Sequence, residues 1–333
     1  MISRIAVIGD GTWGTTLAIM LAEKGLDVVL WSAFPDYLDE MKQSRVNRKY
    51  LPDHKFPENL QLTSDIHAAT DARRLIILAV PSQYFRSVCK IIKDAGAPNV
   101  VYLSVAKGIE DNTLMRMSEV AADVLGEVKV AVMSGPNIAV EIAQKIPSAT
   151  TVSCADMDVA EEVRQALIAS HFRIYTHFDT IGVELGGALK NVIAIAAGII
   201  DGFGMGTNTK SALLTRGLVE IIRLGVSMGA ERDTFYGLSG LGDLATTCFN
   251  PASRNHWFGS LIGKGKSRDE ILRSTDSVVE GVNTSKTARK LYLRYGIEMP
   301  IMEQVYKVVW EGKSPREAIL ELMTREPKRE SSG

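Results

Sequence analysis

The sequence has few cysteines and no excess of charge of either sign. Its three cysteines, Cys89, Cys154 and Cys248, lie far apart and form no CxxC motif, which argues against a disulfide framework and for a reducing compartment. The five histidines show no spacing typical of a metal site. Lysine and arginine number 38 against 39 acidic residues, and the formal net charge of −1 gives no long-range attraction for nucleic acid or an anionic membrane.

The sequence pattern predicts neither a targeting segment nor a membrane span. Residues 1–9 are too short for the apolar region of a signal peptide and lead directly into a glycine turn. Residues 185–200 are apolar or small except for Lys190 and Asn191, but this run is shorter than the ~20 residues that a span requires and carries a lysine in its middle. We therefore predict a core helix here, in a cytoplasmic protein that binds neither membrane nor nucleic acid.

The start of the chain has the pattern of a dinucleotide-binding unit. A β-branched run at residues 5–8 is followed by Gly9-Asp-Gly11-Thr12-Trp13-Gly14, which fits the GxGxxG spacing. Helical spacing over residues 13–24 and an apolar strand at 28–31 come next. In such a unit the first glycine allows a tight turn, the second lets backbone approach a pyrophosphate, and the third lets helix and strand pack closely.

Strands and helices continue to alternate through the first half. Strands are expected near residues 60–62, 75–80, 100–105, 130–134 and 150–154, with a return strand near 173–176 and helices that include 113–125 and 156–170. This order predicts an α/β fold with an N-terminal Rossmann-type doubly wound sheet, over residues 1–180.

After residue 180 the pattern becomes helical. Helices are expected over residues 181–200, 211–228, 284–295, 302–311 and 314–324, and the last begins with a predicted capping box of Ser314 and Glu317 around Pro315. We predict an all-α C-terminal domain over residues 181–325, followed by a solvated tail at 326–333.

Residues that follow the strands are candidates for ligand contacts, because ligands of such sheets bind beyond the carboxyl ends of the strands. Lys107 and Gly108 follow one strand, and the segment from Gly135 through Asn137 to Ala139 follows the next. A solvated loop lysine is an equally good interpretation of Lys107 taken alone.

Lys190 is a candidate for proton transfer. It lies on the apolar helix at 181–200, three and four residues after Gly187 and Gly186, so the pattern predicts room for a ligand beside it. Loss of water favours a neutral amine, which can exchange protons near neutral pH. A lysine that reaches solvent from an ordinary core helix is the alternative.

A glycine-rich loop supplies more polar candidates. Asp243 follows Gly240 and Gly242 and is expected on a constrained turn, where it could pair with a lysine, and Thr247 follows four residues later. Arg254 offers a planar fork suited to the oxygens of a phosphate, between Ser253 and Asn255.

Seven motifs in order then carry a resemblance. They are GDGTWGTTLA, the VAKG turn, SGPNIAVEIA, LGGALKNVIAIAAG, GLSGLGDLATTC, SRN and VVEG, and together they span residues 9–281. The chain closely resembles the bacterial-type NAD(P)-dependent glycerol-3-phosphate dehydrogenases. This resemblance implies hydride transfer between a nicotinamide and C2 of dihydroxyacetone phosphate, giving sn-glycerol 3-phosphate for phospholipid synthesis, in a homodimer.

The resemblance also implies residue roles. Lys190 is implied as the proton donor and acceptor, with Lys107 and Asp243 in the catalytic cluster. Substrate contacts are implied for Lys107, Gly135, Asn137, Lys190, Asn191, Asp243, Thr247, Ser253, Arg254 and Asn255. Cofactor contacts are implied for Gly9, Gly11, Thr12, Trp13, Gly14, Lys107, Ala139, Arg254, Val278 and Glu280. No metal is implied.

The choice between NAD and NADP stays open. An acid about 20 residues after the glycines typically binds the ribose hydroxyls of NAD, and an arginine there favours NADP. Here Ser32-Ala-Phe-Pro35 follows Trp31, where many bacterial members carry arginine, and the next charged candidates are Asp36, Arg45 and Arg48.

Two alternatives remain at this point. One is a related two-domain dehydrogenase of a 3-hydroxy acid or a sugar acid, against which the basic Arg254 segment argues. The other is a redox-sensing NAD-binding module without turnover, against which Lys107, Lys190 and Asp243 argue.

Overall fold

The computed structural model describes residues 2–96, 98–275, 277–327 and 329–330. By its contacts the chain divides into two compact units. The first comprises Met1–Lys107 and Met115–Thr180, and the second comprises Gly108–Leu114 and Ile181–Gly333. Residues 108–114, which the sequence placed in the first domain, thus group with the helical unit. The division after residue 180 lies where the sequence pattern changes from alternating to helical.

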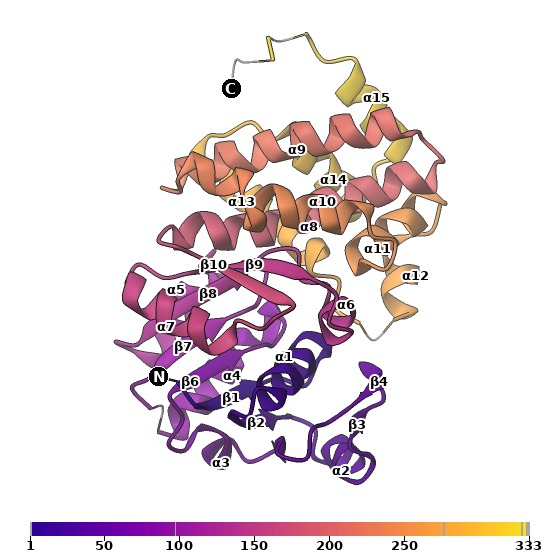
Figure 1. Ribbon diagram of the computed structural model, residues 1–333. Helices are drawn as coiled ribbons and strands as arrows, with labels where there is room; N and C mark the ends of the chain where they lie inside the picture. Colours follow the sequence, from indigo (N-terminus) through magenta and orange to yellow (C-terminus); the bar gives the residue numbers. More distant parts are fainter. Residues whose placement is uncertain (1, 97, 276, 328, 331–333) are drawn as a thin grey trace. The chain divides into compact units, whose positions relative to one another are not determined.

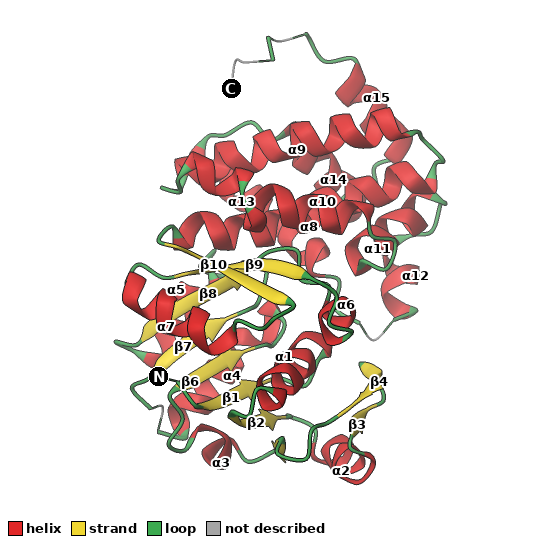
Figure 2. Ribbon diagram, viewed as in Figure 1, coloured by secondary structure: helices red, strands yellow, loops and turns green. Residues whose placement is uncertain are grey.

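The first unit is built on an eight-stranded sheet (Figures 1 and 2) of order β10-β9-β8-β7-β6-β1-β2-β5. The strands are β1 (Arg4–Ile8), β2 (Asp27–Trp31), β5 (Gln61–Thr63), β6 (Leu75–Leu78), β7 (Val101–Ser104), β8 (Lys129–Ser134), β9 (Ser148–Ser153) and β10 (Phe172–His177). Neighbouring strands are parallel except β8 and β9, so β9 and β10 run opposite to the others. The predicted Rossmann-type sheet is confirmed.

Helices cover both faces of this sheet, because its central strands are apolar on both sides. Alternate residues such as Val7 and Leu30 pack with α1 (Thr12–Glu23) and α7 (Met157–Leu167). Their neighbours in sequence pack with α3 (Ile66–Thr70), α4 (Ser82–Asp94) and α5 (Met117–Leu125). The unit also contains α2 (Pro35–Ser44), α6 (Ala139–Ala143) and an antiparallel hairpin of β3 (Val46–Asn47) and β4 (Leu51–Lys55), which the sequence pattern did not predict.

The second unit is helical, as predicted. Its α-helices are α8 (Thr180–Gly202), α9 (Thr207–Ser227), α10 (Asp243–Phe249), α11 (Arg254–Gly263), α12 (Arg268–Arg273), α13 (Glu280–Tyr295), α14 (Pro300–Trp310) and α15 (Pro315–Met323). A 3₁₀ turn, η1 (Arg232–Tyr236), and a π-helical turn, η2 (Leu238–Gly242), precede α10. The predicted capping box at α15 is wrong, because Ser314 makes no side-chain bond to the helix, although Pro315 does occupy the first turn.

Helix α8 is the centre of this unit. It is long and apolar enough to cross a membrane by length and composition, but 94% of the relevant window is buried inside the protein. Side chains of α9, α10, α11, α13 and α14 complete the apolar cluster around it. Core helices of water-soluble proteins pass the same test of length and composition, so α8 is consistent with the predicted core helix.

Candidate functional site

The glycine turn between β1 and α1 has the shape that a dinucleotide requires. Gly9 has a φ of +117°, and a Cβ there would lie 2.7 Å from the carbonyl oxygen of Ala79. A Cβ on Gly14 would lie 2.0 Å from the carbonyl oxygen of Gly9, so only glycine lets α1 pack this closely. Gly11 faces open space and is the N-cap residue of α1, which has no side-chain cap. The first turn of α1 can therefore present backbone N–H groups to a pyrophosphate.

Asp10, inside this turn, makes a contact that the sequence did not reveal. Its Oδ2 accepts a hydrogen bond of 2.7 Å from the hydroxyl of Ser32, the residue directly after β2. Both side chains are buried, and burial raises the pKa of Asp10, while the Ser32 bond and the charge of Lys49 oppose that rise. An acidic group thus reaches the end of β2 from the glycine turn.

Thr12, Trp13 and Ala139 lie around the start of α1. Thr12 is the first residue of that helix, and the Trp13 ring packs edge-on against Phe172 with centroids 6.2 Å apart. The carbonyl of Ala139 accepts a bond of 3.2 Å from the Thr16 hydroxyl, which joins the start of α6 to α1.

Lys107, Gly135 and Asn137 lie together beyond the ends of β7 and β8. The Lys107 ammonium donates to the carbonyl of Gly135 at 2.8 Å. Asn137 donates to the Thr150 hydroxyl at 3.0 Å, and a Cβ on Gly135 would lie 2.8 Å from the same oxygen. The Oδ1 atom of Asn137 is buried without a hydrogen-bond partner among the described residues. A buried acceptor of this kind is satisfied by an ordered water or by a donor from a ligand.

In the second unit, Lys190 is buried in a polar cluster with Asp243 and Thr247. Its ammonium forms a short ion pair with Oδ1 of Asp243 and donates to the Thr247 hydroxyl at 2.6 Å. The Thr247 hydroxyl in turn donates to the backbone carbonyl of Asp243 at 2.7 Å. Lys190 and Asp243 are 6% and 1% exposed, so the ion pair is held in an apolar surrounding and not in bulk water.

The turn η2 brings Asp243 to Lys190. The amide of Gly242 donates to the carbonyl of Gly237, five residues earlier, and this widened turn runs directly into α10. A Cβ on Gly186 would lie 2.6 Å from the carbonyl oxygen of Ser239. The expectation that Gly186 leaves room for a ligand is therefore wrong, because the backbone of η2 takes that space. Such π-turns occur frequently at functional sites.

Asn191 and Asn255 are bonded to each other. The amide of Asn255 donates to Oδ1 of Asn191 at 2.8 Å, and its own Oδ1 accepts from the backbone N–H of Gly281 at 2.8 Å. Both side chains are buried. Asn255 thus joins α8, α11 and the start of α13 beside Lys190, which gives it a structural role in addition to any contact with a ligand.

Arg254 is exposed at the first turn of α11. Its guanidinium donates to the carbonyl of Val278 at 3.2 Å, in the segment that leads into α13 at Glu280. Ser253 caps α11 by accepting from the His256 amide at 3.4 Å. The exposed guanidinium retains donors for an anion at the N-terminal end of a helix, where negative charge is favoured.

His256 is a further buried polar residue that no motif indicated. Its Nε2 lies 2.7 Å from Oδ2 of Asp201, which also accepts from Lys210 at 2.5 Å. Burial alone raises the pKa of Asp201, but the bonds from Lys210 and His256 outweigh it and lower this pKa. These bonds join α8, α9 and α11 within the helical unit.

The comparisons with known proteins decide the family. Two family models match, described as the NAD-dependent glycerol-3-phosphate dehydrogenase N-terminus over residues 4–160 and C-terminus over residues 179–320. The chain belongs to the NAD-dependent glycerol-3-phosphate dehydrogenase family. It is thus an oxidoreductase that uses NAD or NADP, as the seven motifs indicated.

Individual relatives of the family agree over the whole length. A glycerol-3-phosphate dehydrogenase [NAD(P)+] from Geobacter metallireducens is 46% identical, over 98% of each chain. One from a Thermoanaerobacter species is 44% identical, over 99% of each. The crystal structure of the Coxiella burnetii glycerol-3-phosphate dehydrogenase matches with a TM-score of 0.93 at 38% identity, covering 97% of this chain and 99% of that one.

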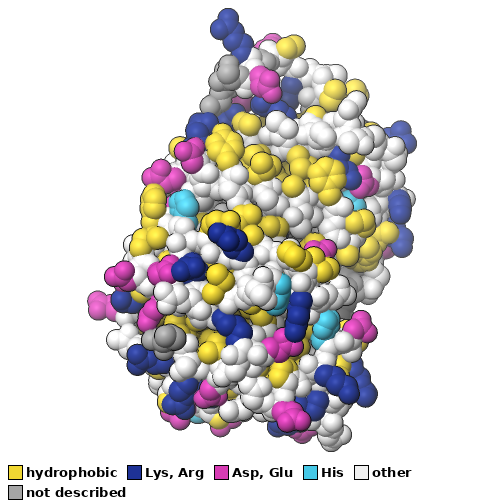
Figure 3. All heavy atoms as spheres, in the orientation of Figure 1, with side chains coloured by type: hydrophobic (Ala, Val, Ile, Leu, Met, Phe, Trp, Pro, Cys, Tyr) yellow, Lys and Arg dark blue, Asp and Glu magenta, His cyan; other side chains and the backbone are white. Residues whose placement is uncertain are grey.

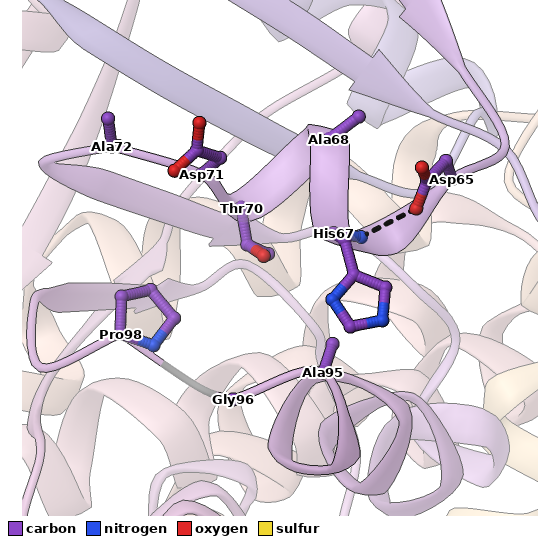
Figure 4. Close-up of a pocket in the computed structure, with 9 residues that line it drawn as sticks. All are labelled: Asp65, His67, Ala68, Thr70, Asp71, Ala72, Ala95, Gly96 and Pro98. Atoms are coloured by element: carbon purple, nitrogen blue, oxygen red, sulfur yellow. Dashed lines mark hydrogen bonds between the residues drawn. The ribbon is translucent and has the colours of Figure 1, made fainter.

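One open hollow on the first unit shows no comparable cluster of polar groups among the described residues. An open hollow of about 470 Å³ lies beside the segments that precede β6 and β7, at the edge of the sheet opposite the glycine turn. Figure 4 shows His67 and Asp65 in its lining, with the Asp65 carboxylate already bonded to the His67 amide. Basic and acidic side chains are interspersed on the face that Figure 3 draws. Among the described residues, no group of three or more His, Cys, Asp or Glu could hold a metal ion.

Proposed function

We propose that the protein catalyses the reversible, NAD(P)H-dependent reduction of dihydroxyacetone phosphate to sn-glycerol 3-phosphate, which supplies glycerophospholipid synthesis. The observation that carries this proposal is the buried cluster of Lys190, Asp243 and Thr247, in a chain that also has the dinucleotide turn of its family. A buried lysine held by a carboxylate and a hydroxyl is suited to proton transfer at a substrate oxygen.

The nicotinamide group, when bound, supplies the hydride for C2 of dihydroxyacetone phosphate. Lys190 stabilises the negative charge that develops on the C2 oxygen and donates a proton to it. Asp243 holds the ammonium form before the reaction, and Thr247 fixes the direction of the Nζ group. In the oxidative direction the neutral amine accepts the proton from the C2 hydroxyl.

The phosphate of the substrate is bound by Arg254 and the first turn of α11. The guanidinium provides charged, planar donors, and the open end of α11 adds backbone N–H groups. Ser253 contributes its hydroxyl donor, since it only accepts in the helix cap. Asn191 and Asn255 line the same part of the helical unit and keep α11 beside Lys190.

The first unit holds the cofactor and adds contacts to the substrate. Gly9, Gly11, Thr12, Trp13 and Gly14 form the pyrophosphate turn. Polar groups beyond β7 and β8 come from Lys107, Gly135, Asn137 and Ala139. Among the described residues, the buried Oδ1 atom of Asn137 has no hydrogen-bond partner. Arg254, Val278 and Glu280 are proposed as the cofactor contacts from the helical unit.

We further propose a cytoplasmic location and a homodimer. The location is supported by three buried cysteines that form no disulfide among the described residues and by the burial of α8. The dimer is the expectation from the family resemblance, and analytical ultracentrifugation of the purified chain tests it.

Oxidation of NADH or NADPH in the presence of dihydroxyacetone phosphate tests the proposed reaction. We expect turnover with dihydroxyacetone phosphate and none with a 3-oxo acid that lacks phosphate, because only a phosphate offers a third oxygen and a second negative charge to Arg254 and the N–H groups at the start of α11. Turnover with the 3-oxo acid alone would favour the alternative dehydrogenase class. Binding of NADH without turnover of either substrate would favour a redox-sensing module.

A further inference from the structure

We infer that Asp10, in the glycine turn, takes the place of the missing strand-end acid, binds the adenosine ribose hydroxyls and makes the enzyme prefer NAD(H) to NADP(H). The inference deepens the proposed function, since it rests on the first unit binding a nicotinamide dinucleotide. It assigns the choice of cofactor to a residue outside the segment that follows β2, where such acids usually lie.

The position of Asp10 follows from the pairing of the first two strands. Strands β1 and β2 are parallel, with Ile8 opposite Trp31. The residues that follow, Gly9 and Asp10 on one side and Ser32 on the other, therefore emerge together at the carboxyl edge of the sheet. The amide of Gly9 donates to the carbonyl of Trp31 at 3.0 Å, which fixes the two ends side by side. This is the edge at which the ribose of a dinucleotide binds in such folds.

The carboxylate is directed to that edge by Ser32. The Ser32 hydroxyl donates to Oδ2 of Asp10 at 2.7 Å and accepts from the backbone amide of Phe34 at 3.1 Å. Ser32 is fully buried, so the bond is protected from water. The backbone carbonyl of Asp10 is also held, because it accepts from the Asn47 amide at 2.7 Å and from the Thr15 hydroxyl at 3.1 Å.

Of the two nearby arginines, Arg45 is bonded to backbone carbonyls, and Arg48 makes only an exposed ion pair. Arg45 donates to the carbonyls of Pro57, Glu58 and Leu60 and lies over the Phe56 ring. Arg48 lies 3.7 Å from Glu40, with both side chains largely exposed. The remaining basic group is Lys49, whose charge acts on Asp10 and whose ammonium lies over the Tyr50 ring at 5.3 Å.

These groups discriminate between the two cofactors by charge. A carboxylate accepts hydrogen bonds from the 2′ and 3′ hydroxyls of NAD, whereas the 2′-phosphate of NADP would bring like charges together in a partly desolvated place. The positive charge of Lys49 acts in the opposite direction, because it attracts the 2′-phosphate of NADP. Asp10 is fixed at the strand end by its bond from Ser32, whereas water screens the charge of Lys49 on its exposed turn, so the carboxylate contributes more to the choice of cofactor.

The test is the binding of NADH and NADPH to the full-length protein without substrate, followed by nicotinamide fluorescence. We expect the wild type to bind NADH at least tenfold more tightly than NADPH, a ratio worth roughly 1.4 kcal/mol. Asp10→Asn keeps the shape and a Ser32 partner but removes the charge, and should reduce the ratio of the two Kd values to less than about threefold, chiefly by tighter NADPH binding. Asp36→Asn, an exposed acid just past the same strand end, is the matched control and should leave the ratio unchanged.

Each outcome decides a separate point. A wild-type ratio below tenfold, or an unchanged ratio in Asp10→Asn, would overturn the role of Asp10. A shift produced by Asp36→Asn would assign the discrimination to Asp36 instead. If the asparagine variant fails to fold, Asp10→Ser provides the same test, because it also removes the negative charge and keeps a hydroxyl that can bond Ser32. Absence of binding by both cofactors would contradict the proposed function itself.

Discussion

At the scale of single residues, the structure brings together groups that the sequence indicated only by motif. Lys190, Asp243 and Thr247 are up to 57 positions apart in the chain and bond directly. The motifs named these residues, but the pairing depends on η2 and on the place of α10 beside α8. The contact between Asp10 and Ser32 had no signal in the sequence, because it arises from the register of β1 with β2.

Removal of the Arg254 guanidinium should weaken binding of the substrate phosphate. We expect Arg254→Ala to raise the KM for dihydroxyacetone phosphate by at least tenfold, since each charged hydrogen bond contributes roughly 1.5–3 kcal/mol. Arg254→Lys should restore only part of this loss, because an ammonium lacks the planar fork. Steady-state kinetics at saturating cofactor measure both variants, and an unchanged KM in the alanine variant would exclude Arg254 from the phosphate site.

At the scale of elements, glycines allow α8 and α11 to pack in direct contact. A Cβ on Gly259 would lie 2.0 Å from the carbonyl oxygen of Ile195, and one on Gly198 equally close to that of His256. The same contact leads to the bond between Asn191 and Asn255. The sequence showed the glycines in a helical pattern, but the partner helix could not be read from spacing alone.

This helix contact should be intolerant of a single methyl group. We expect Gly259→Ala to destabilise the protein by about 1–3 kcal/mol or more, because the clash is with backbone and cannot be relieved by a rotamer change. Gly206→Ala, where a Cβ would meet nothing within 4 Å, is the control without a clash; it should cost at most about 1 kcal/mol, because alanine is only a poorer N-cap of α9 than glycine. Denaturant unfolding compares the two, and equal midpoints would show that the helices separate easily.

The N-terminus of α14 is capped from another helix by a buried acid. The N-cap residue, Met299, makes no side-chain hydrogen bond to the helix. Instead, the Glu220 carboxylate on α9 accepts from the backbone amides of Ile301 and Met302 at 2.7 and 3.1 Å. Burial raises the pKa of Glu220 to about 7, although these two bonds oppose the rise. The sequence gave no sign of this contact, because Glu220 lies 81 residues before Ile301.

Glu220 should make stability depend on pH. Its pKa is higher in the folded protein than the ordinary 4.5, so the folded state binds more protons between about pH 4.5 and 7 and its stability falls as pH rises through that range. We expect a loss of about 2 kcal/mol between pH 5 and pH 8 in the wild type relative to Glu220→Gln, which cannot titrate. Urea unfolding at the two pH values measures it, and parallel curves for both proteins would contradict the assignment.

At the scale of the whole molecule, the change from alternating to helical periodicity predicted the two-part architecture and the sheet. It missed the β3–β4 hairpin, whose strands are short and polar, and it placed residues 108–114 in the first domain although they pack with the helical unit. Within residues 108–114, Asp111 is bonded by Lys286 and Lys290. These partners lie 175 and 179 residues further along the chain, so the periodicity of the local sequence gives no sign of them.

The account as a whole depends on Lys190 transferring the proton at C2. The most direct measurement is kcat for dihydroxyacetone phosphate reduction, with both substrates saturating, in the wild type and in Lys190→Met, which keeps the length of the side chain but carries no proton. We expect kcat to fall by about 10²–10⁴-fold, the usual contribution of general acid–base catalysis, while the Kd for NADH and the circular dichroism spectrum are unchanged. A kcat close to that of the wild type in a folded, NADH-binding Lys190→Met variant would contradict the account.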